Sequence, residues 1–142
     1  MPRMNLQKSH KMAYAAVLGL EGYTRMRMPA RLNELVKLRA SLLNGCGYCI
    51  AMHTKALEKA GESQERMDAL EGEVPSSLFD ERELAALALT DAVTRLEMGG
   101  VPDDVWDEAA RVFSEAELGD LVVAIATINV WNRMGIATKL DA

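Results

Sequence analysis

The chain has 142 residues, of which 49% are hydrophobic and 26% are charged, and its formal net charge is −5. A chain of this length and composition can bury a core of its own, so the simplest prediction is one domain over residues 1–142. No basic run is present that could follow nucleic-acid phosphates, which argues against a nucleic-acid partner. Two cysteines are too few for a secreted disulfide scaffold. A close pair of them is typical of redox or metal chemistry in a reducing compartment, here the cytoplasm.

The N-terminal stretch superficially resembles a signal peptide, because basic residues precede the apolar run Met12–Leu20. No small-residue cleavage site follows before the charges that begin at Glu21, so we interpret the run as a helix of the mature protein. Ser9 is placed to cap this helix, which we expect to end near Gly22. No apolar run approaches the roughly 20 residues that a bilayer requires, so we expect no membrane span. We expect the apolar residues of the helix to pack in the core: Met12, Ala16, Leu18 and Leu20.

A second helix is predicted to open at Pro29 and to run to Asn44, with leucines and valine at helical spacing as its buried stripe. Arg39 interrupts that stripe. We expect it either to snorkel or to meet a carboxylate, inside the protein or across a subunit boundary. The Asn44-Gly45 pair is a helix-stop signal, and a new helix begins at Cys46, so the chain turns back as a helical hairpin.

Two cysteines and a histidine share one face of this new helix. Cys46, Cys49 and His53 follow one another at steps of three and four residues, so neighbouring Cβ atoms lie roughly 5–6 Å apart. A helix N-terminus and a nearby imidazole both lower the pKa of a thiol. Across the hairpin, Glu34 falls about one turn beyond His53, where its carboxylate can orient the ring. The order thiol, imidazole, carboxylate is that of a nucleophile, its base and an orienting group.

These residues resemble the signature of the carboxymuconolactone decarboxylase superfamily, and within it the alkylhydroperoxidase D-like proteins. That signature places a glutamate twelve residues before a Cys-x-x-Cys and a histidine four residues after the second cysteine, as Glu34, Cys46, Cys49 and His53 stand here. The flanking words ELVKLR, NGCGYC and INVWNR are similar to those of the small peroxidase-related members, and the similarity covers most of the chain. One departure is Tyr48, which stands where the best-studied type of alkylhydroperoxidase D carries a second histidine.

The resemblance implies an all-α fold, homo-oligomers that are trimers or hexamers built from them, and reduction of a hydroperoxide through the Cys46–Cys49 pair. It implies no bound cofactor or metal, and an external dithiol of the lipoyl or thioredoxin type as reductant. We assign Cys49, which adjoins His53, as the thiol that attacks the peroxide. Cys46 is expected to be more exposed, and we assign it as the resolving thiol and the site of reductant attack. His53 is assigned as base and then acid, oriented by Glu34.

Two alternatives treat these residues as structural. Glu34 could be a solvent-facing residue paired with Lys37, and His53 could be a core histidine with both ring nitrogens satisfied. Three alternatives concern function. The chain could be a general dithiol–disulfide oxidoreductase or redox sensor, or a lactone decarboxylase, whose chemistry does not need the cysteine pair. It could also be a structural zinc module with three of its four ligands from Cys46, Cys49 and His53.

The rest of the chain also predicts helices. Asn129 and Asn132 continue the apolar stripe of the last helix, so they need hydrogen bonds when buried, in the core or at a subunit contact, and we expect their role to be structural. The whole pattern predicts an all-α helical bundle of about six to seven helices. The remaining signals are a cap at Gly61, a short helix from Ser63, a loop over Gly72–Asp80, a capping box at Asp80 opening a helix to about Met98, a helix from Pro102, and a capping box at Ser114.

Overall fold

The computed structural model describes residues 1–141 and is all-α, as predicted; Ala142, the end of the expected domain, lies outside the described residues. The additional helix relative to the expected six or seven is the single turn at the N-terminus, which is capped by Asn5, buries no residue and is too short to leave a periodic signal. Within residues 1–141 there are eight helices: α1 Leu6–Ser9, α2 Lys11–Arg27, α3 Ala30–Asn44, α4 Gly47–Lys59, α5 Gln64–Asp68, α6 Glu81–Thr94, α7 Asp103–Val112 and α8 Glu115–Thr138.

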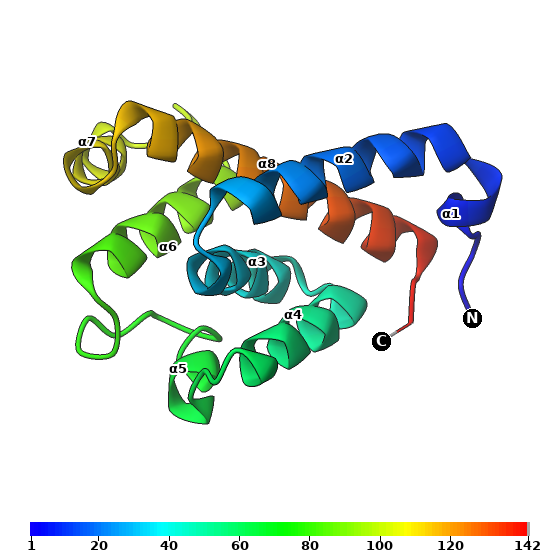
Figure 1. Cartoon of the computed structure of the whole chain (residues 1–142), viewed down its shortest axis with the longest axis horizontal. Helices are drawn as coiled ribbons and strands as arrows, with labels where there is room; N and C mark the ends of the chain where they lie inside the picture. The colour runs from blue at the N-terminus through cyan, green and yellow to red at the C-terminus, as the bar shows by residue number, and fades with distance from the viewer. Residues whose placement is uncertain (142) are drawn as a thin grey trace.

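Helix α3 lies at the centre of the bundle and packs against α4, α6 and α8 (Figure 1). Nine of its fifteen residues are buried. One side, with Leu32 and Val36, packs with residues of α6, α7 and α8, and the other, with Leu35 and Leu38, packs with residues of α4 to α6. Each such side chain contributes roughly 1.5–3 kcal/mol when fully buried. The position of α3 therefore determines where the turn that carries the cysteines lies.

The predicted helix ends are confirmed at most boundaries. Gly45 ends α3 with a φ of 73°, the left-handed conformation that glycine adopts without strain. Capping boxes open α6 at Asp80 and α8 at Ser114. Helix α6 ends at Thr94 and not near Met98, because Arg95 leaves the helical conformation and its guanidinium donates a hydrogen bond to the carbonyl of Leu43 at the end of α3.

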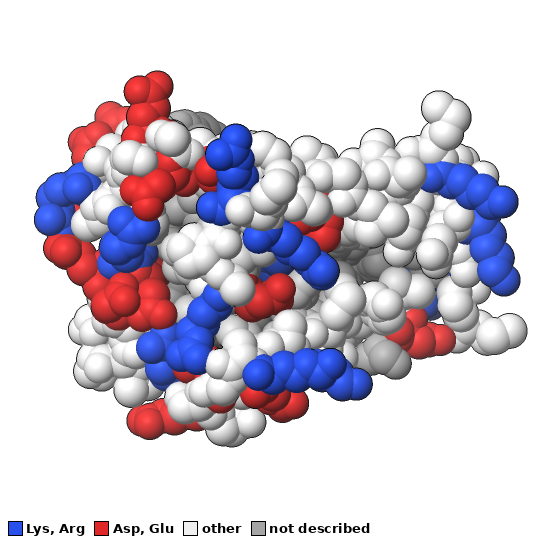
Figure 2. Space-filling model, in the orientation of Figure 1, with Lys and Arg blue, Asp and Glu red and all other residues white. Residues whose placement is uncertain are grey.

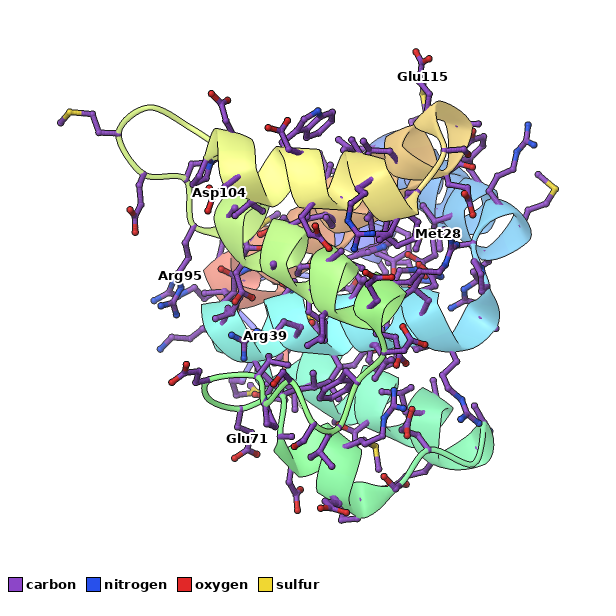
Figure 3. The ribbon with its side chains drawn as sticks, turned by 90° about the vertical axis from the view of Figure 1, so that its left-hand side faces the viewer. Met28, Arg39, Glu71, Arg95, Asp104 and Glu115 are labelled. Atoms are coloured by element: carbon purple, nitrogen blue, oxygen red, sulfur yellow. A yellow bond between two sulfur atoms is a disulfide. The ribbon has the colours of Figure 1, made fainter. Side chains whose placement is uncertain are left out.

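Arg39 meets a carboxylate inside the same chain. Its Nε and Nη2 donate to the two carboxylate oxygens of Asp91 in α6 at 2.7 and 2.9 Å. Its Nη1 donates to the carbonyls of Leu70 and Gly72. Figure 3 shows Arg39 between α3 and the loop that carries Glu71. This buried arginine thus links that loop and α6 to α3. Its structural role explains why a charged residue interrupts the apolar stripe of α3.

Helix α2 contradicts the expectation that its apolar residues pack in the core. Met12 is 90% exposed, and Leu18 and Leu20 are 50% and 43% exposed; Ala16 is exposed as well. The helix continues past Gly22 to Arg27, and Ser9 closes α1 and does not cap α2. The reason is that α2 packs chiefly on α8, so most of its circumference has no neighbour in the chain.

Figure 2 shows charged side chains gathered over the end of the molecule with α6 and α7, whereas the surface over α2 between its two basic ends is largely uncharged. The buried residues of α2 are polar, namely Glu21 and Thr24. Exposed apolar residues together with buried residues that are polar depart from the pattern of an ordinary surface helix.

Helix α8 is long and apolar enough to cross a bilayer by length and composition, with a mean hydropathy of 1.3 over its most apolar window. This property of α8 was not expected from the sequence, because polar residues interrupt the apolar run of the helix. In the structure α8 packs against α2, α3 and α6, and a core helix with several neighbours meets the same criterion.

Candidate functional site

The helical hairpin of α3 and α4 brings Glu34 to His53, as the sequence predicted. The Nδ1 atom of His53 lies 2.6 Å from Oε2 of Glu34. Because a carboxylate can only accept, Nδ1 carries the proton, and the lone pair of the neutral ring lies on Nε2. That Nε2 atom is buried and has no hydrogen-bond partner within residues 1–141. Neither structural alternative is correct: Glu34 does not pair with Lys37 at the surface, and His53 is not a fully satisfied core histidine.

The two cysteines are joined as a disulfide at the start of α4, with their Cα atoms 5.3 Å apart. Cys46 is the N-cap residue, and its Sγ accepts a hydrogen bond from the backbone N–H of Cys49. When reduced, a thiolate at this position would gain from the same N–H and from the helix dipole. Both cysteines are only 2% exposed. The expectation that Cys46 is the more accessible of the two is therefore wrong.

Helix α8 lies directly against the sulfur atoms. A Cβ atom placed on Gly135 would lie 3.2 Å from Sγ of Cys46 and 3.9 Å from Sγ of Cys49. A glycine within a long helix costs about 1 kcal/mol relative to alanine, and here it allows the α8 backbone to approach the disulfide. The sequence analysis did not single out Gly135. An interior glycine in an otherwise strong helix was the available signal.

A cavity of about 210 Å³ lies over Cys49 and His53, at the end of the molecule where both termini lie (Figure 1). It is lined by residues of α2, α4, α8 and the N-terminal segment; Cys49 is among them and Cys46 is not. For scale, an engineered apolar cavity of about 150 Å³ holds benzene. Tyr48, the residue at the position of the second histidine, also lines it. Apart from Glu21, Arg25 and His53 the walls are mostly apolar, and include Tyr14, Leu18, Met52, Trp131, Met134 and Leu140.

One wall of this cavity carries an ion pair that the sequence analysis missed. Lys37 is 0% exposed and its Nζ lies 2.5 Å from Oε1 of Glu21, while the indole N–H of Trp131 donates to Oε2 at 3.2 Å. Burial raises the pKa of Glu21, but the hydrogen bond and charge of Lys37, together with Arg25 and Trp131, outweigh it and hold that pKa below its ordinary value of 4.5. The signal in the sequence was a lysine at a buried position of the α3 pattern, which requires a buried acidic partner.

Asn129 and Asn132, which the sequence predicts to need hydrogen bonds, fix the turn before the cysteines to α8. The amide of Asn44, at the end of α3, donates to the side-chain oxygens of Asn129 and Asn132 at 2.9 and 3.0 Å. Asn132 in turn donates to Oγ of Ser41 at 3.0 Å. Their hydrogen bonds lie inside the core of the chain, and the network fixes the point from which the chain turns towards Cys46.

The described part of the chain offers no cluster of side chains that could bind a metal ion. No group of three or more His, Cys, Asp and Glu side chains among residues 1–141 is arranged to hold an ion. The chemistry that the geometry does offer is thiol–disulfide exchange beside a buried base, within a cavity large enough for an organic molecule.

Comparison with known proteins places the chain in a family. Residues 11–92 match the model of the carboxymuconolactone decarboxylase family. The chain is 35% identical over 122 residues to the uncharacterized protein YdfG of Bacillus subtilis (strain 168), an alignment that covers 85% of this chain and 83% of that protein.

Two solved structures share the fold. A protein of unknown function from Agrobacterium tumefaciens, described as a putative antioxidant defence protein AhpD, superposes with a TM-score of 0.94 at 34% identity, over 99% of this chain and 97% of that one. An uncharacterized peroxidase-related protein from Silicibacter sp. TM1040 superposes with a TM-score of 0.77 at 17% identity, over 88% of this chain and 67% of that one. The fold is thus of the alkylhydroperoxidase D-like type, and the chain belongs to the carboxymuconolactone decarboxylase family.

Proposed function

We propose that this protein is a thiol-dependent peroxidase that reduces organic hydroperoxides through Cys46 and Cys49, with His53 and Glu34 as the proton relay. The observation that carries the proposal is that Cys49 and His53 line one largely apolar cavity, and that Nε2 of His53 is buried with no hydrogen-bond partner among residues 1–141. A reactive thiol needs a base within reach, and a hydroperoxide with an organic group needs an apolar site. The described relatives, a putative antioxidant defence protein and a peroxidase-related protein, are consistent with this chemistry.

The reaction begins with the reduced protein. His53 takes the proton of the Cys49 thiol on Nε2, and the resulting imidazolium is stabilised by Glu34. The thiolate attacks the outer oxygen of the hydroperoxide, the O–O bond breaks, and the leaving alkoxide takes the proton from His53 as an alcohol. Cys49 is now a sulfenic acid. The thiol of Cys46 condenses with it, which forms the disulfide and releases water.

An external dithiol completes the cycle. One thiolate of the donor attacks Cys49, whose side chain lines the cavity, and Cys46 leaves as a thiolate that the helix N-terminus stabilises. The second donor thiol then resolves the mixed disulfide, so the donor leaves oxidised and both protein thiols are restored. In this scheme the reductant attacks Cys49, whereas the sequence analysis assigned that role to Cys46. The reason is that the two cysteines are equally buried and, of the two, only Cys49 lines the cavity. We propose the cytoplasm as the compartment, where thiol pools keep such a pair reducible.

We also propose that the chain forms homo-oligomers, trimers or hexamers built from them, through the outer face of α2. The exposed Met12 and Leu20 on that face support the proposal, because an exposed apolar surface usually meets a partner. Sedimentation of the purified protein tests it. A monomer at micromolar concentration would contradict it.

The function is tested by counting thiols in the reduced protein before and after one equivalent of cumene hydroperoxide. We expect the loss of two thiols per chain, one intramolecular disulfide and one equivalent of alcohol. His53→Gln should slow this oxidation by roughly a hundredfold, the lower end of what a general base contributes. The matched control is His10→Gln, since His10 is exposed and its ring bonds only to the neighbouring Ser9 among residues 1–141. If both variants react as fast as the wild type, the relay is wrong; if both thiols survive the peroxide, the proposed function is wrong.

A further inference from the structure

The stripe of α2 that faces the cavity changes from apolar to charged along the helix. Its cavity-lining residues are Tyr14, Leu18, Glu21 and Arg25, which recur at three- and four-residue steps. At about 1.5 Å of rise per residue, the stripe runs for roughly 16 Å. Tyr14 packs edge-on against the ring of Trp131 at 5.1 Å between centroids, so the N-terminal part of the stripe is an aromatic wall. The C-terminal part presents a carboxylate and a guanidinium.

The charged part of the stripe has an excess of one positive charge. The carboxylate of Glu21 accepts from Lys37 and Arg25 on Oε1 and from Trp131 on Oε2. Its pKa is lowered, so it is ionised at neutral pH, and the buried Lys37 already balances its charge. The charge of Arg25 therefore remains uncompensated by Glu21 at this wall.

Arg25 also keeps hydrogen-bonding capacity for a ligand. Its Nε donates to Glu21 at 3.2 Å, which holds the planar group at the cavity. Its two Nη groups make no hydrogen bond to any of residues 1–141, and the side chain is 64% exposed, so it stands at the cavity mouth. Paired Nη groups of a guanidinium match the two oxygens of a carboxylate.

We propose that the cavity binds amphipathic organic carboxylates, with the apolar chain against Tyr14 and Leu18 and the carboxylate on Arg25. The preferred substrates are then hydroperoxides of organic acids, such as fatty-acid hydroperoxides, over neutral alkyl hydroperoxides. The assignment of a substrate class rests on the proposed peroxidase function, whereas the binding site for the carboxylate does not. Arg25 acts here as a specificity-determining residue.

The experiment measures binding without requiring turnover. Decanoate and decan-1-ol are titrated into the reduced wild-type protein by calorimetry, and into Arg25→Gln and Arg27→Gln variants. Arg27 is the matched control, because it lies on the same helix but rests on the ring of Tyr23 and does not line the cavity. We expect decanoate to bind more tightly than decan-1-ol, and Arg25→Gln to weaken decanoate by about five- to tenfold, the range for a partly exposed charged hydrogen bond. Arg27→Gln should leave both affinities unchanged.

Two further measurements place the ligand and separate the two proposals. Decanoate should slow alkylation of Cys49 in the Cys46→Ser variant, because the chain would lie over that sulfur. Equal affinity for acid and alcohol, equal effects of the two arginine variants, or no protection of Cys49 would each overturn the inference. Turnover of cumene hydroperoxide tests the peroxidase separately. If it is reduced while decanoate shows no preference, only the inference fails. If decanoate binds as expected and no hydroperoxide is reduced, the proposed function fails together with the substrate class, whereas the carboxylate-binding site stands.

Discussion

Adding one methyl group at Gly135 should destabilise the oxidised protein, although the same change elsewhere in α8 should stabilise it. In a helix interior, glycine to alanine ordinarily stabilises by about 1 kcal/mol. At Gly135 the new Cβ would lie 3.2 Å from Sγ of Cys46, closer than unstrained van der Waals contact, whereas its distance of 3.9 Å from Sγ of Cys49 is an ordinary contact. The sulfur atoms or α8 must then shift by a few tenths of an ångström, and such overpacking costs about 1–3 kcal/mol.

The net effect of Gly135→Ala is a loss of up to about 2 kcal/mol, which corresponds to a fall in Tm of up to roughly 6 °C in a domain of this size. The control is Gly119→Ala, because Gly119 lies in the same helix and a Cβ there would meet nothing within 4 Å. We expect that variant to gain up to about 1 kcal/mol. Thermal and urea unfolding of both variants, oxidised and reduced, measure the difference. The deficit of Gly135→Ala should shrink in the reduced protein, because free thiols can rotate away. Equal stabilisation of the two oxidised variants would refute the close approach of α8 to the sulfurs.

Three other predictions concern the relay, the cysteines and the buried pair. Glu34→Gln should slow thiol oxidation by at least roughly tenfold, because the amide no longer enforces a proton on Nδ1 of His53; stopped-flow oxidation by cumene hydroperoxide measures it, and an unchanged rate would remove Glu34 from the relay. Cys46→Ser should stop at a sulfenic acid on Cys49, detectable by dimedone labelling, whereas Cys49→Ser should give no rapid oxidation; the reverse pattern would exchange the roles of the two cysteines. The pKa of Glu21 is held below 4.5 in the folded chain, so its stabilising contribution is present above about pH 4.5 and is lost as the pH falls through the folded pKa. Lys37→Met should cost about 3 kcal/mol near neutral pH by leaving Glu21 buried without its main partner, and much less at low pH; a loss of stability that does not depend on pH would contradict the pairing.

The local signals of the sequence predicted the helices that have strong caps. The capping boxes at Asp80 and Ser114 and the glycine at Gly45 each act within a few residues, so their effect depends little on distant packing. The same local rules misjudged α2. The apolar residues of that helix have helical spacing, but only the placement of α2 on α8 decides which of its faces is covered.

The pairing of Glu34 with His53 is predictable from the sequence, because both residues lie on one helical hairpin whose turn fixes which positions face each other. Gly135 and Trp131 could not be placed in this way. They are more than eighty residues from the cysteines, and no periodicity within one helix indicates which distant helix will lie against it.

The sequence by itself determined which reactive groups the candidate site holds: two thiols, an imidazole and a carboxylate at fixed spacing on two consecutive helices. The tertiary structure decided the setting of these groups. It placed α8 against the sulfurs, buried Lys37 on Glu21, and enclosed Cys49 in a cavity whose wall on α2 changes from aromatic to cationic. The physical reason is the distance along the chain over which each kind of interaction acts. Spacing along a helix fixes neighbours one turn away, whereas burial, access and charge compensation depend on helices that meet only when the whole bundle has packed.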